Sequence, residues 1–308
     1  MSDHTSSTTP IHIHPPDPRP ISVASPLEQL VAAVLASPKY CTISPALVER
    51  IGRQELAVRP GWKEAVKATK NRLHQVGGAY FQTRPDYEKA LARLREAAGG
   101  GMEGLRPVCQ EVMRWHTSTR ERLPFLEQFY AETIGTLPDL HSVIDIACGL
   151  NPLALPWMPF ANTQNPQPSS ALHPPSSVSA PLTYYAYDIY SDLVAFLNGF
   201  LALARVEGRA EVRDVVGHPP DRPADLALLL KTLPCLEQLE KGAAGRLLEA
   251  VQARYLLVSF PARSLGGRPK GMVENYEAWF LDLIEGKGWR VERFEFPTEL
   301  AFLVQKGE

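Results

Sequence analysis

The residues best placed to bind a ligand are one glycine and two aspartates, each at the end of a short apolar segment. Gly149 follows SVIDIAC, Asp188 lies near the end of TYYAYDIY, and Asp214 is the aspartate of AEVRDVV. A glycine after a buried strand lets a ligand approach the backbone, and carboxylates accept hydrogen bonds from sugar hydroxyls or from an amino group. The pattern indicates a nucleoside site, although an ordinary turn at the glycine, or a helix N-cap at either aspartate, would use the same residue types.

The turn around Gly149 also bears on the class of cofactor. Dinucleotide sites need several glycines because the pyrophosphate rests against backbone N–H groups at a helix N-terminus. In this chain Gly149 is closely followed by Asn151 and Pro152, so the turn is poor in glycine. S-adenosylmethionine (SAM) has no phosphate and fits this turn better, whereas an acidic residue at Asp188 is compatible with both SAM and NAD.

The second half of the chain alternates strand-like segments with helix-length segments, which is typical of a parallel sheet in an α/β fold. The strand-like segments cover residues 142–148, 183–190, 210–216, 225–233 and 254–261. Two more strands are expected near the C-terminus, and the connection Pro-Thr-Glu between them is too short for a parallel crossover. Five parallel strands followed by an antiparallel hairpin are the class I, Rossmann-like sheet of SAM-dependent methyltransferases.

The rest of the chain divides into regions of different composition. Residues 27–130 show helical spacing of apolar residues and predict a small helical domain, and residues 131–308 form the predicted methyltransferase domain. The Pro-rich residues 1–26 predict a disordered tail, and a Pro/Ser-rich stretch at about 160–181 predicts a disordered insertion. Residues 19–122 hold 17 Lys and Arg against 10 Asp and Glu. This excess suggests that the helical domain binds a polyanion, with a solvated helix face as the alternative.

Two groups of basic residues are candidates for RNA binding, because phosphate contacts supply much of the affinity for RNA. The first group lies in one predicted helix, mostly on one face, and comprises Lys67, Lys70, Arg72 and His74. The second lies in a Gly-rich loop after the fifth strand and comprises Arg263, Arg268 and Lys270. A generic basic loop is the alternative for the second group. Phe260 and Met272 flank this loop and are candidates to stack on an extruded base.

Several classes of protein are disfavoured by composition. The four cysteines are scattered and form no C-x-x-C pair, so we expect reduced thiols, no metal site and a cytoplasmic protein. No apolar run approaches the roughly 18 residues of a membrane span. The polar, Pro-rich N-terminus does not have the pattern of a signal peptide.

Five motifs together resemble one enzyme family. They are RLHQVGGAY, HTSTRERLPFL, VIDIACGLNPLAL, LALLLKTLPCLE and SFPARSLGGRPKGM, and they fall in the family's order between about Leu30 and Val304. The chain is similar to the aminoglycoside-resistance 16S ribosomal RNA (guanine-N7) methyltransferases of the Arm/Rmt/Sgm type. The resemblance implies methyl transfer from SAM to N7 of guanine 1405 in the 30S ribosomal subunit, by a monomer. The tail and the insertion depart from the family pattern.

The resemblance also implies a set of cofactor-binding residues. They are His116, Thr119, Arg122, Asp145, Ala147, Gly149, Asn151, Asp188, Ile189, Asp214, Val215 and Lys231. Arg122, helped by Thr119, is expected to hold the SAM carboxylate, since a guanidinium binds a carboxylate through two hydrogen bonds; an ion pair on the helix surface is the alternative. Asp188 is expected to accept from both ribose hydroxyls and Asp214 from the adenine amino group. Lys231 is expected to meet an anion such as a phosphate.

The expected chemistry needs no general base. N7 of guanine is an exposed lone pair that attacks the sulfonium methyl directly, so the enzyme supplies alignment and electrostatic support. Cys148 is therefore interpreted as a small packed residue. Two alternatives stay open, a small-molecule methyltransferase with the same sheet and a non-catalytic RNA-binding protein that retains it. The basic helical domain disfavours the first, and the intact sequence DIACGLNP disfavours the second.

Overall fold

The structure is a computed structural model that describes residues 24–75, 85–138, 140–160, 181–262 and 272–307. The predicted tail and the predicted insertion lie almost wholly outside these ranges. Arg263, Arg268 and Lys270 also lie outside the described residues. The roles expected for these segments therefore stay predictions.

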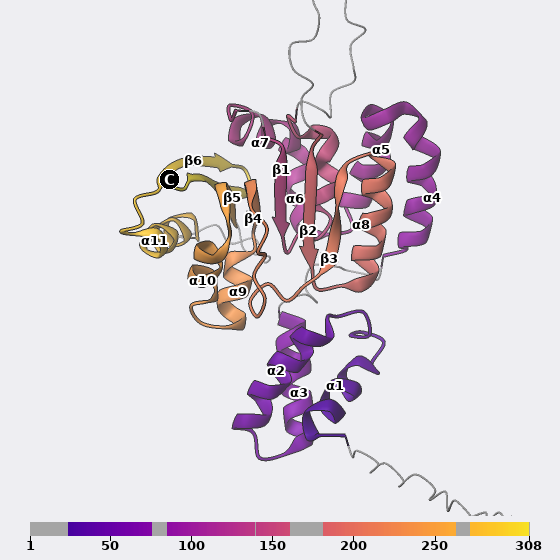
Figure 1. The fold of residues 1–308 in the computed structure, drawn as a ribbon, viewed down its shortest axis with the longest axis vertical. Helices are drawn as coiled ribbons and strands as arrows, with labels where there is room; N and C mark the ends of the chain where they lie inside the picture. The colour runs from indigo at the N-terminus through magenta and orange to yellow at the C-terminus, as the bar shows by residue number, and fades with distance from the viewer. Residues whose placement is uncertain (1–23, 76–84, 139, 161–180, 263–271, 308) are drawn as a thin grey trace, which may run out of the picture.

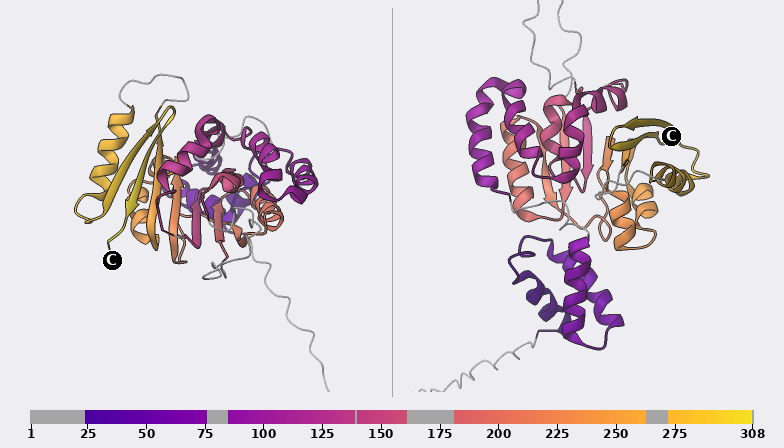
Figure 2. Two further views of the ribbon diagram at one scale, coloured as in Figure 1. Left: turned by 90° about the horizontal axis from the view of Figure 1, so that it is seen from above. Right: turned by 180° about the vertical axis from the view of Figure 1, so that it is seen from behind.

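A seven-stranded sheet forms the centre of the molecule (Figure 1; Figure 2). Its strands are β1 (Ser142–Ile146), β2 (Thr183–Asp188), β3 (Glu207–Val212), β4 (Ala224–Leu230), β5 (Ala253–Pro261), β6 (Arg290–Phe296) and β7 (Glu299–Gln305). They follow the order β3-β2-β1-β4-β5-β7-β6, and only the pairs of β7 with β5 and with β6 are antiparallel among the described strands. The predicted class I methyltransferase sheet with its terminal hairpin is confirmed.

Helices cover both faces of the sheet, because successive side chains of a strand point to opposite faces. Val143 belongs to the apolar cluster of one face and Ile144 to that of the other. The first face packs against α4 (Tyr87–Ala97), α5 (Gly101–Met113), α7 (Leu126–Thr133), α8 (Ser191–Leu203) and the 3-10 helix η4 (Asn151–Trp157). The second packs against α9 (Leu233–Leu239), α10 (Ala243–Ala250) and α11 (Met272–Ile284). The shorter helices are η2 (Ala98–Gly100), α6 (Thr117–Arg122) and η3 (Leu123–Phe125).

Helices α1 (Pro26–Leu35), α2 (Pro45–Val58) and α3 (Trp62–Leu73) form a separate unit with its own apolar core. We call residues 24–75 the three-helix unit. Ser25 and Ser44 cap α1 and α2, because each hydroxyl accepts a backbone N–H of the first turn. The unit lies beyond the carboxyl ends of the parallel strands (Figure 1). An antiparallel β-bridge between Ile43 and Tyr190 connects it to the segment after β2.

The division between the two domains differs from the prediction. Helices α4 to α7 fall within the predicted helical domain of residues 27–130, yet Leu94 and Phe129 belong to the same apolar cluster as Val143 of β1. Helical periodicity identifies an apolar face, but it does not reveal whether that face meets other helices or a sheet. The helical domain is therefore smaller than predicted, and α4 to α7 form one layer of the methyltransferase domain.

Candidate functional site

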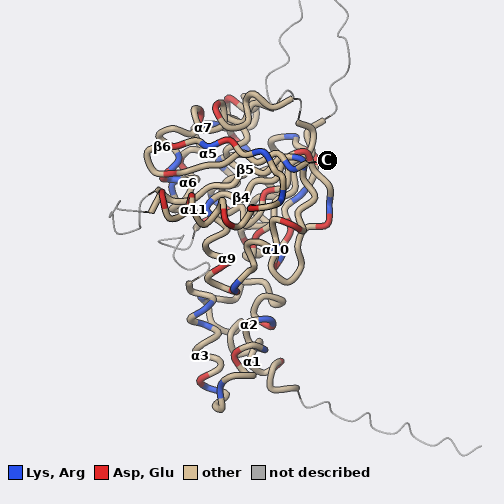
Figure 3. The backbone as a smooth tube through the Cα atoms, turned by 90° about the vertical axis from the view of Figure 1, so that its left-hand side faces the viewer, with Lys and Arg blue, Asp and Glu red and all other residues tan. Residues whose placement is uncertain are grey.

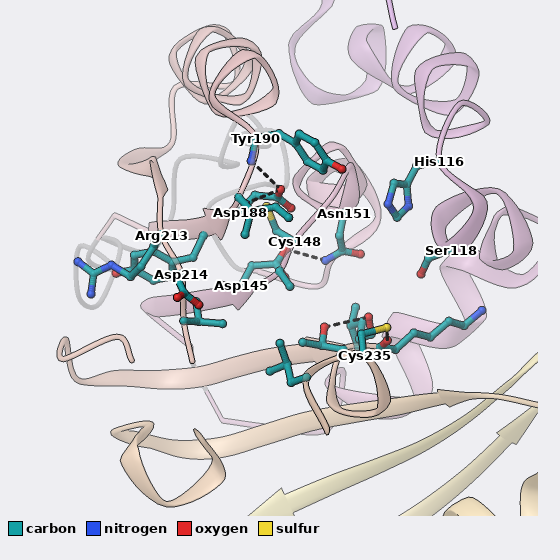
Figure 4. A pocket seen from close by; sticks show the side chains of 18 of the residues that line it. His116, Ser118, Asp145, Cys148, Asn151, Asp188, Tyr190, Arg213, Asp214 and Cys235 are labelled. Atoms are coloured by element: carbon teal, nitrogen blue, oxygen red, sulfur yellow. Dashed lines mark hydrogen bonds between the residues drawn. The ribbon is translucent and has the colours of Figure 1, made fainter. Parts of the chain in front are cut away.

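A pocket lies at the carboxyl ends of the parallel strands, next to the three-helix unit (Figure 4). Of the twelve residues predicted to bind the cofactor, eleven line it, namely His116, Thr119, Arg122, Asp145, Ala147, Asn151, Asp188, Ile189, Asp214, Val215 and Lys231. The twelfth, Gly149, lies next to the pocket, where it donates a hydrogen bond to Asp188 and packs against His116. The fold thus brings the predicted residues together, as expected for open α/β sheets, which bind ligands at this edge.

The turn after β1 is tightly packed, and the packing accounts for its single glycine. Ala147 and Gly149 have positive φ angles of 52° and 51°, which L-residues with a side chain rarely adopt. A Cβ on residue 149 would lie 2.9 Å from Nε2 of His116, so a side chain there would displace the imidazole. The N–H of Gly149 donates to Oδ2 of Asp188 at 2.9 Å. The turn is thereby fixed to the end of β2.

Asp188 fastens the loops after β1 and β2 to one another. Besides the bond from Gly149, its Oδ1 accepts from the N–H groups of Ile189 at 2.7 Å and Tyr190 at 3.2 Å. Burial raises the pKa of Asp188, while the three backbone donors oppose that rise. A carboxylate has about four acceptor positions, so roughly one is left, on Oδ2. The expected contact with both ribose hydroxyls stays a prediction, and in this structure the protein leaves about one acceptor position for it.

Asp214 is paired with a residue of the three-helix unit. Arg50 on α2 donates from Nε to Oδ2 at 2.5 Å and from Nη2 to Oδ1 at 3.0 Å. The N–H of Val216 reaches Oδ1 at 3.3 Å. Oδ2 keeps an acceptor position, which is compatible with the predicted contact to an amino group. Arg50 was not predicted, because it lies 164 residues from Asp214 in the sequence.

Asn151 connects the turn after β1 to the base of the pocket (Figure 4). Its Nδ2 donates to Oδ2 of Asp145 at 2.9 Å. Its Oδ1 accepts from the hydroxyl of Tyr130 at 2.6 Å and from Nη1 of Arg122 at 3.0 Å. The hydroxyl of Tyr184 also donates to Oδ2 of Asp145, at 2.7 Å. Burial raises the pKa of Asp145 to about 6, because these neutral donors only partly stabilise its charge.

Arg122 is paired with a carboxylate of the protein, and its predicted contact with the SAM carboxylate stays a prediction. Its guanidinium donates from Nε and Nη2 to Glu299, at 3.0 and 2.6 Å, and its side chain is 1% exposed. The fork expected to hold the SAM carboxylate is therefore filled by a carboxylate of the protein. The hydroxyl of Thr119 is also engaged, since it donates to the carbonyls of Met113 and His116. Both residues line the pocket, and their side-chain polar groups are engaged by the protein.

Lys231 was predicted to meet an anion such as a phosphate, and the anions that it meets in this structure are carboxylates of the protein. Its Nζ lies 2.8 Å from Oε2 of Glu121 and 3.5 Å from Oε2 of Glu299. Burial disfavours the charge of Glu299, but Arg122 and Lys231 hold its pKa below its usual range. These two cations and two carboxylates balance in charge. Glu299 was not predicted as a site residue, because a glutamate after a tight turn is ordinarily a surface residue.

His116 is neutral at physiological pH. Burial lowers its pKa to about 3, and the charges of Arg122 and Lys231 add to the shift. A neutral imidazole beside Gly149 gives this wall of the pocket a polar surface without a positive charge. Other lining residues that were not predicted as cofactor-binding include Leu47 from α2, Ser118 beside His116, and Arg213 beside Asp214.

Phe260 is not available to stack on a base. It is fully buried and packs against the rings of Tyr276, Trp279, Phe280 and Phe302. Because strand residues alternate in direction, the side chain of Phe260 enters the core between β5 and α11. Met272 begins α11 and is half-buried. Its predicted contact with the target base stays a prediction.

The basic residues predicted on one helix lie on α3 and at its C-cap, and they divide into two groups. Lys67 and His74 are exposed and Lys70 is partly exposed, and the spacing places these three on one face of the helix. Arg72 points elsewhere, because it donates to Glu55 of α2 and to the carbonyl of Leu239. Its predicted role in RNA binding is therefore corrected to a role in attaching the three-helix unit. Figure 3 shows basic residues along this unit.

Two of the four cysteines, Cys148 and Cys235, line the pocket. Cys148 is buried, and burial raises the pKa of its thiol well above the usual value; the prediction of a packed residue is confirmed. Among the residues that the structure describes, no group of three His, Cys, Asp or Glu side chains is arranged to hold a metal ion. In the same ranges, no helix has both the length and the apolar character needed to cross a bilayer.

The sequence matches one protein-family model over most of its length. Residues 36–303 match the family described as "Ribosomal RNA methyltransferase (FmrO)". A 16S rRNA (guanine(1405)-N(7))-methyltransferase of Micromonospora echinospora is 36% identical over 283 residues, covering 91% of this chain and 97% of that protein. The enzyme of the same name from Frankia casuarinae is 38% identical over 284 residues, covering 91% and 94%.

Two solved structures are similar over nearly the whole chain. The 16S rRNA methyltransferase RmtF in complex with S-adenosyl-L-homocysteine has a TM-score of 0.73 at 29% identity, and the match covers 93% of this chain and all of that chain. The 16S rRNA methylase RmtB has a TM-score of 0.71 at 27% identity, covering 91% and 98%. Both matches include the three-helix unit as well as the sheet, because neither domain alone reaches such coverage.

Proposed function

The chain belongs to the FmrO family of ribosomal RNA methyltransferases, and on that premise we propose that it methylates N7 of guanine 1405 in 16S rRNA. The methyl donor is SAM, and the substrate is the assembled 30S subunit. The observation that carries the proposal is the pocket itself, in which Asp188 and Asp214 lie at adjacent strand ends beside the turn at Gly149. We expect the enzyme to act as a monomer in the cytoplasm.

The residues of the pocket fit a nucleoside with a sulfonium group. Asp188 and Asp214 each keep about one acceptor position, as a ribose hydroxyl and an adenine amino group require. Ile189 and Val215 add apolar surface next to them, suited to the face of a purine ring. Gly149 allows His116 to pack closely against the first turn, which shapes this wall of the pocket. The carboxylates also favour a ligand that carries a positive charge.

The reaction requires alignment more than proton transfer. SAM supplies a methyl group activated by its positively charged sulfur, and guanine N7 forms the new N–C bond as the C–S bond breaks. The side chains of this pocket neither remove nor add a proton, which agrees with the neutral His116 and the protonated Cys148. The buried pairs around Arg122 and Asn151 hold the pocket walls rigid, which is how a protein fixes two reactants for in-line attack.

The three-helix unit supplies a surface for RNA. Lys67 and Lys70 have no carboxylate within ion-pair distance among the described residues, so their charges are available to phosphates. His74 extends this face by one turn of the helix. A surface spread over one helix needs RNA folded into a fixed shape, so short decoding-site hairpins should react poorly. Methylation gives the guanine a permanent positive charge, which repels polycationic aminoglycosides that approach its N7 edge and so confers resistance.

The test is to incubate 30S subunits with the protein and SAM, and to map N7-methylguanine by chemical cleavage and primer extension. A stop at guanine 1405 is expected. A stop at adenine 1408, or no stop on 30S subunits combined with methylation of a small molecule, would overturn the proposal. A second arm measures binding of S-adenosylhomocysteine by calorimetry. Replacing Asp188 by Ala should weaken it by about tenfold or more, because the ribose contact and both loops depend on this carboxylate.

A further inference from the structure

Arg50 on α2 joins two segments that border the pocket. Besides its two hydrogen bonds to Asp214, it donates from Nη1 to Oε2 of Glu240 at 2.6 Å. Asp214 follows β3, and Glu240 directly follows α9. The Arg50 side chain is 19% exposed, so this contact is largely shielded from solvent. A single side chain of the three-helix unit therefore fixes two segments of the methyltransferase domain.

The three-helix unit also fixes the segment that follows Asp188. The backbone of residues 42–44 pairs with that of residues 189–191 through two hydrogen bonds of 2.8 and 2.7 Å. Leu47, one turn before Arg50 on α2, lines the pocket directly. Helix α2 and the residues before it thus border both segments that carry the acidic residues of the pocket. The pocket is incomplete without this unit.

Asp214 depends on Arg50 for its charge balance. In the described part of the chain, Arg50 is the only cation within ion-pair distance of Asp214, whose side chain is 3% exposed. Water has little access to such a carboxylate. Without its partner, the carboxylate would turn toward solvent, because a buried charge without a partner is costly. The acceptor position on Oδ2 would then no longer be fixed.

We propose that Arg50 positions Asp214 to accept the adenine amino group of SAM, and that α2 is thereby part of the cofactor site as well as of the RNA-docking unit. The inference rests on the proposed function, since it takes SAM as the ligand. Arg50 is a positioning residue, because it acts through Asp214 and not on the ligand. A bound cofactor and a docked three-helix unit should therefore stabilise one another.

The test compares Arg50→Ala with Arg53→Ala by titration calorimetry with S-adenosylhomocysteine. Arg53 is a matched control, since it lies one turn away on α2, is 69% exposed and pairs with Glu49 at the surface. Arg50→Ala should weaken binding by about tenfold or more, and Arg53→Ala should leave it unchanged. Arg50→Lys keeps the positive charge but lacks the two-donor guanidinium group, so its affinity should lie between that of the wild type and that of Arg50→Ala. If Arg50→Ala does not fold, the binding affinity of Arg50→Lys is compared with that of the wild type instead.

A double mutant separates positioning from a general loss of structure. If Arg50 acts through Asp214, Arg50→Ala combined with Asp214→Ala should bind no more weakly than Asp214→Ala alone. In the wild type, S-adenosylhomocysteine should also slow amide hydrogen exchange in α2. Additive losses, or wild-type affinity in a folded Arg50→Ala or Arg50→Lys variant, would overturn the inference. Failure of the wild type itself to bind S-adenosylhomocysteine would instead count against the proposed function.

Discussion

Asp145 near the end of β1 and Glu299 at the start of β7 are both buried carboxylates, yet their pKa values shift in opposite directions. Asp145 lines the pocket, and Glu299 contacts the lining residues Arg122 and Lys231. Burial raises the pKa of Asp145 to about 6, whereas the pKa of Glu299 is held below its usual range despite burial. The two are connected through Asn151 and Arg122, which form one chain of hydrogen bonds between them. Both side chains are buried, so the degree of burial does not explain why their pKa values shift in opposite directions.

The donors in direct contact explain it. Asp145 receives hydrogen bonds from an amide and a phenol, both neutral, so the cost of burying its charge is only partly offset. Glu299 contacts a guanidinium and an ammonium, whose charges favour its ionised form. The comparison also separates two functions of charge in this pocket. The cations near Glu299 are neutralised within the protein, whereas Asp188 and Asp214 each keep about one acceptor position.

The largest effect is expected when the charge of Glu299 is removed. Glu299→Ala leaves Arg122 without its ion pair and should lower the free energy of unfolding by about 3–5 kcal/mol, the cost typical of breaking a buried pair. Urea unfolding at pH 7 measures this change. Glu292→Ala on the neighbouring strand β6 is the control, because Glu292 is exposed and should change stability by no more than about 0.5 kcal/mol. Equal losses in the two variants would contradict the role given to Glu299.

The fold could be predicted from the sequence where local patterns decide it. Four of the five parallel strands are apolar runs, and the short connection at Pro297 and Thr298 fixes the antiparallel direction of the last pair. The exception is β3, a largely exposed edge strand at Glu207–Val212 with the sequence EGRAEV, which begins and ends several residues before the predicted segment 210–216. The division of the helices could not be predicted in this way. The helix at Leu94 and the helix at Leu73 have the same periodicity, but the first packs on the sheet and the second in the three-helix unit.

The site could be predicted in its location but not in its ion pairs. The positions of Asp188 and Asp214 follow from the strands that carry them, because the ends of parallel strands meet at one edge. Arg50 and Glu299 were missed, since their partners lie 164 and 177 residues away. Phe260 was a candidate to stack on a base but is buried, because the apolar run of β5 shows no alternation that would reveal which side chains enter the core.

An intermediate effect, dependent on pH, is expected for Asp145→Asn. The pKa of Asp145 rises from 3.8 to about 6 on folding, so the folded state binds the proton more tightly. Its contribution to stability is full below about pH 4 and is lost as pH rises through 6. Asparagine keeps an acceptor oxygen and does not titrate. The stability of the wild type relative to Asp145→Asn should therefore fall by about 1–3 kcal/mol between pH 4 and pH 7.5, measured by urea unfolding. Parallel pH profiles would show that Asp145 does not titrate as inferred.

The smallest effect is expected for Glu121→Gln, which removes the charge of the second carboxylate that contacts Lys231. Glu121 lies closer to Lys231 than Glu299 does, at 2.8 Å against 3.5 Å, but its side chain is 33% exposed. Water screens a partly exposed pair, and Lys231 keeps Glu299 when Glu121 is neutralised. The free energy of unfolding should therefore fall by less than about 1 kcal/mol, and the loss should shrink further in high salt. Unfolding in urea at low and high salt measures both. A loss as large as that of Glu299→Ala would mean that proximity, and not burial, decides which carboxylate neutralises Lys231.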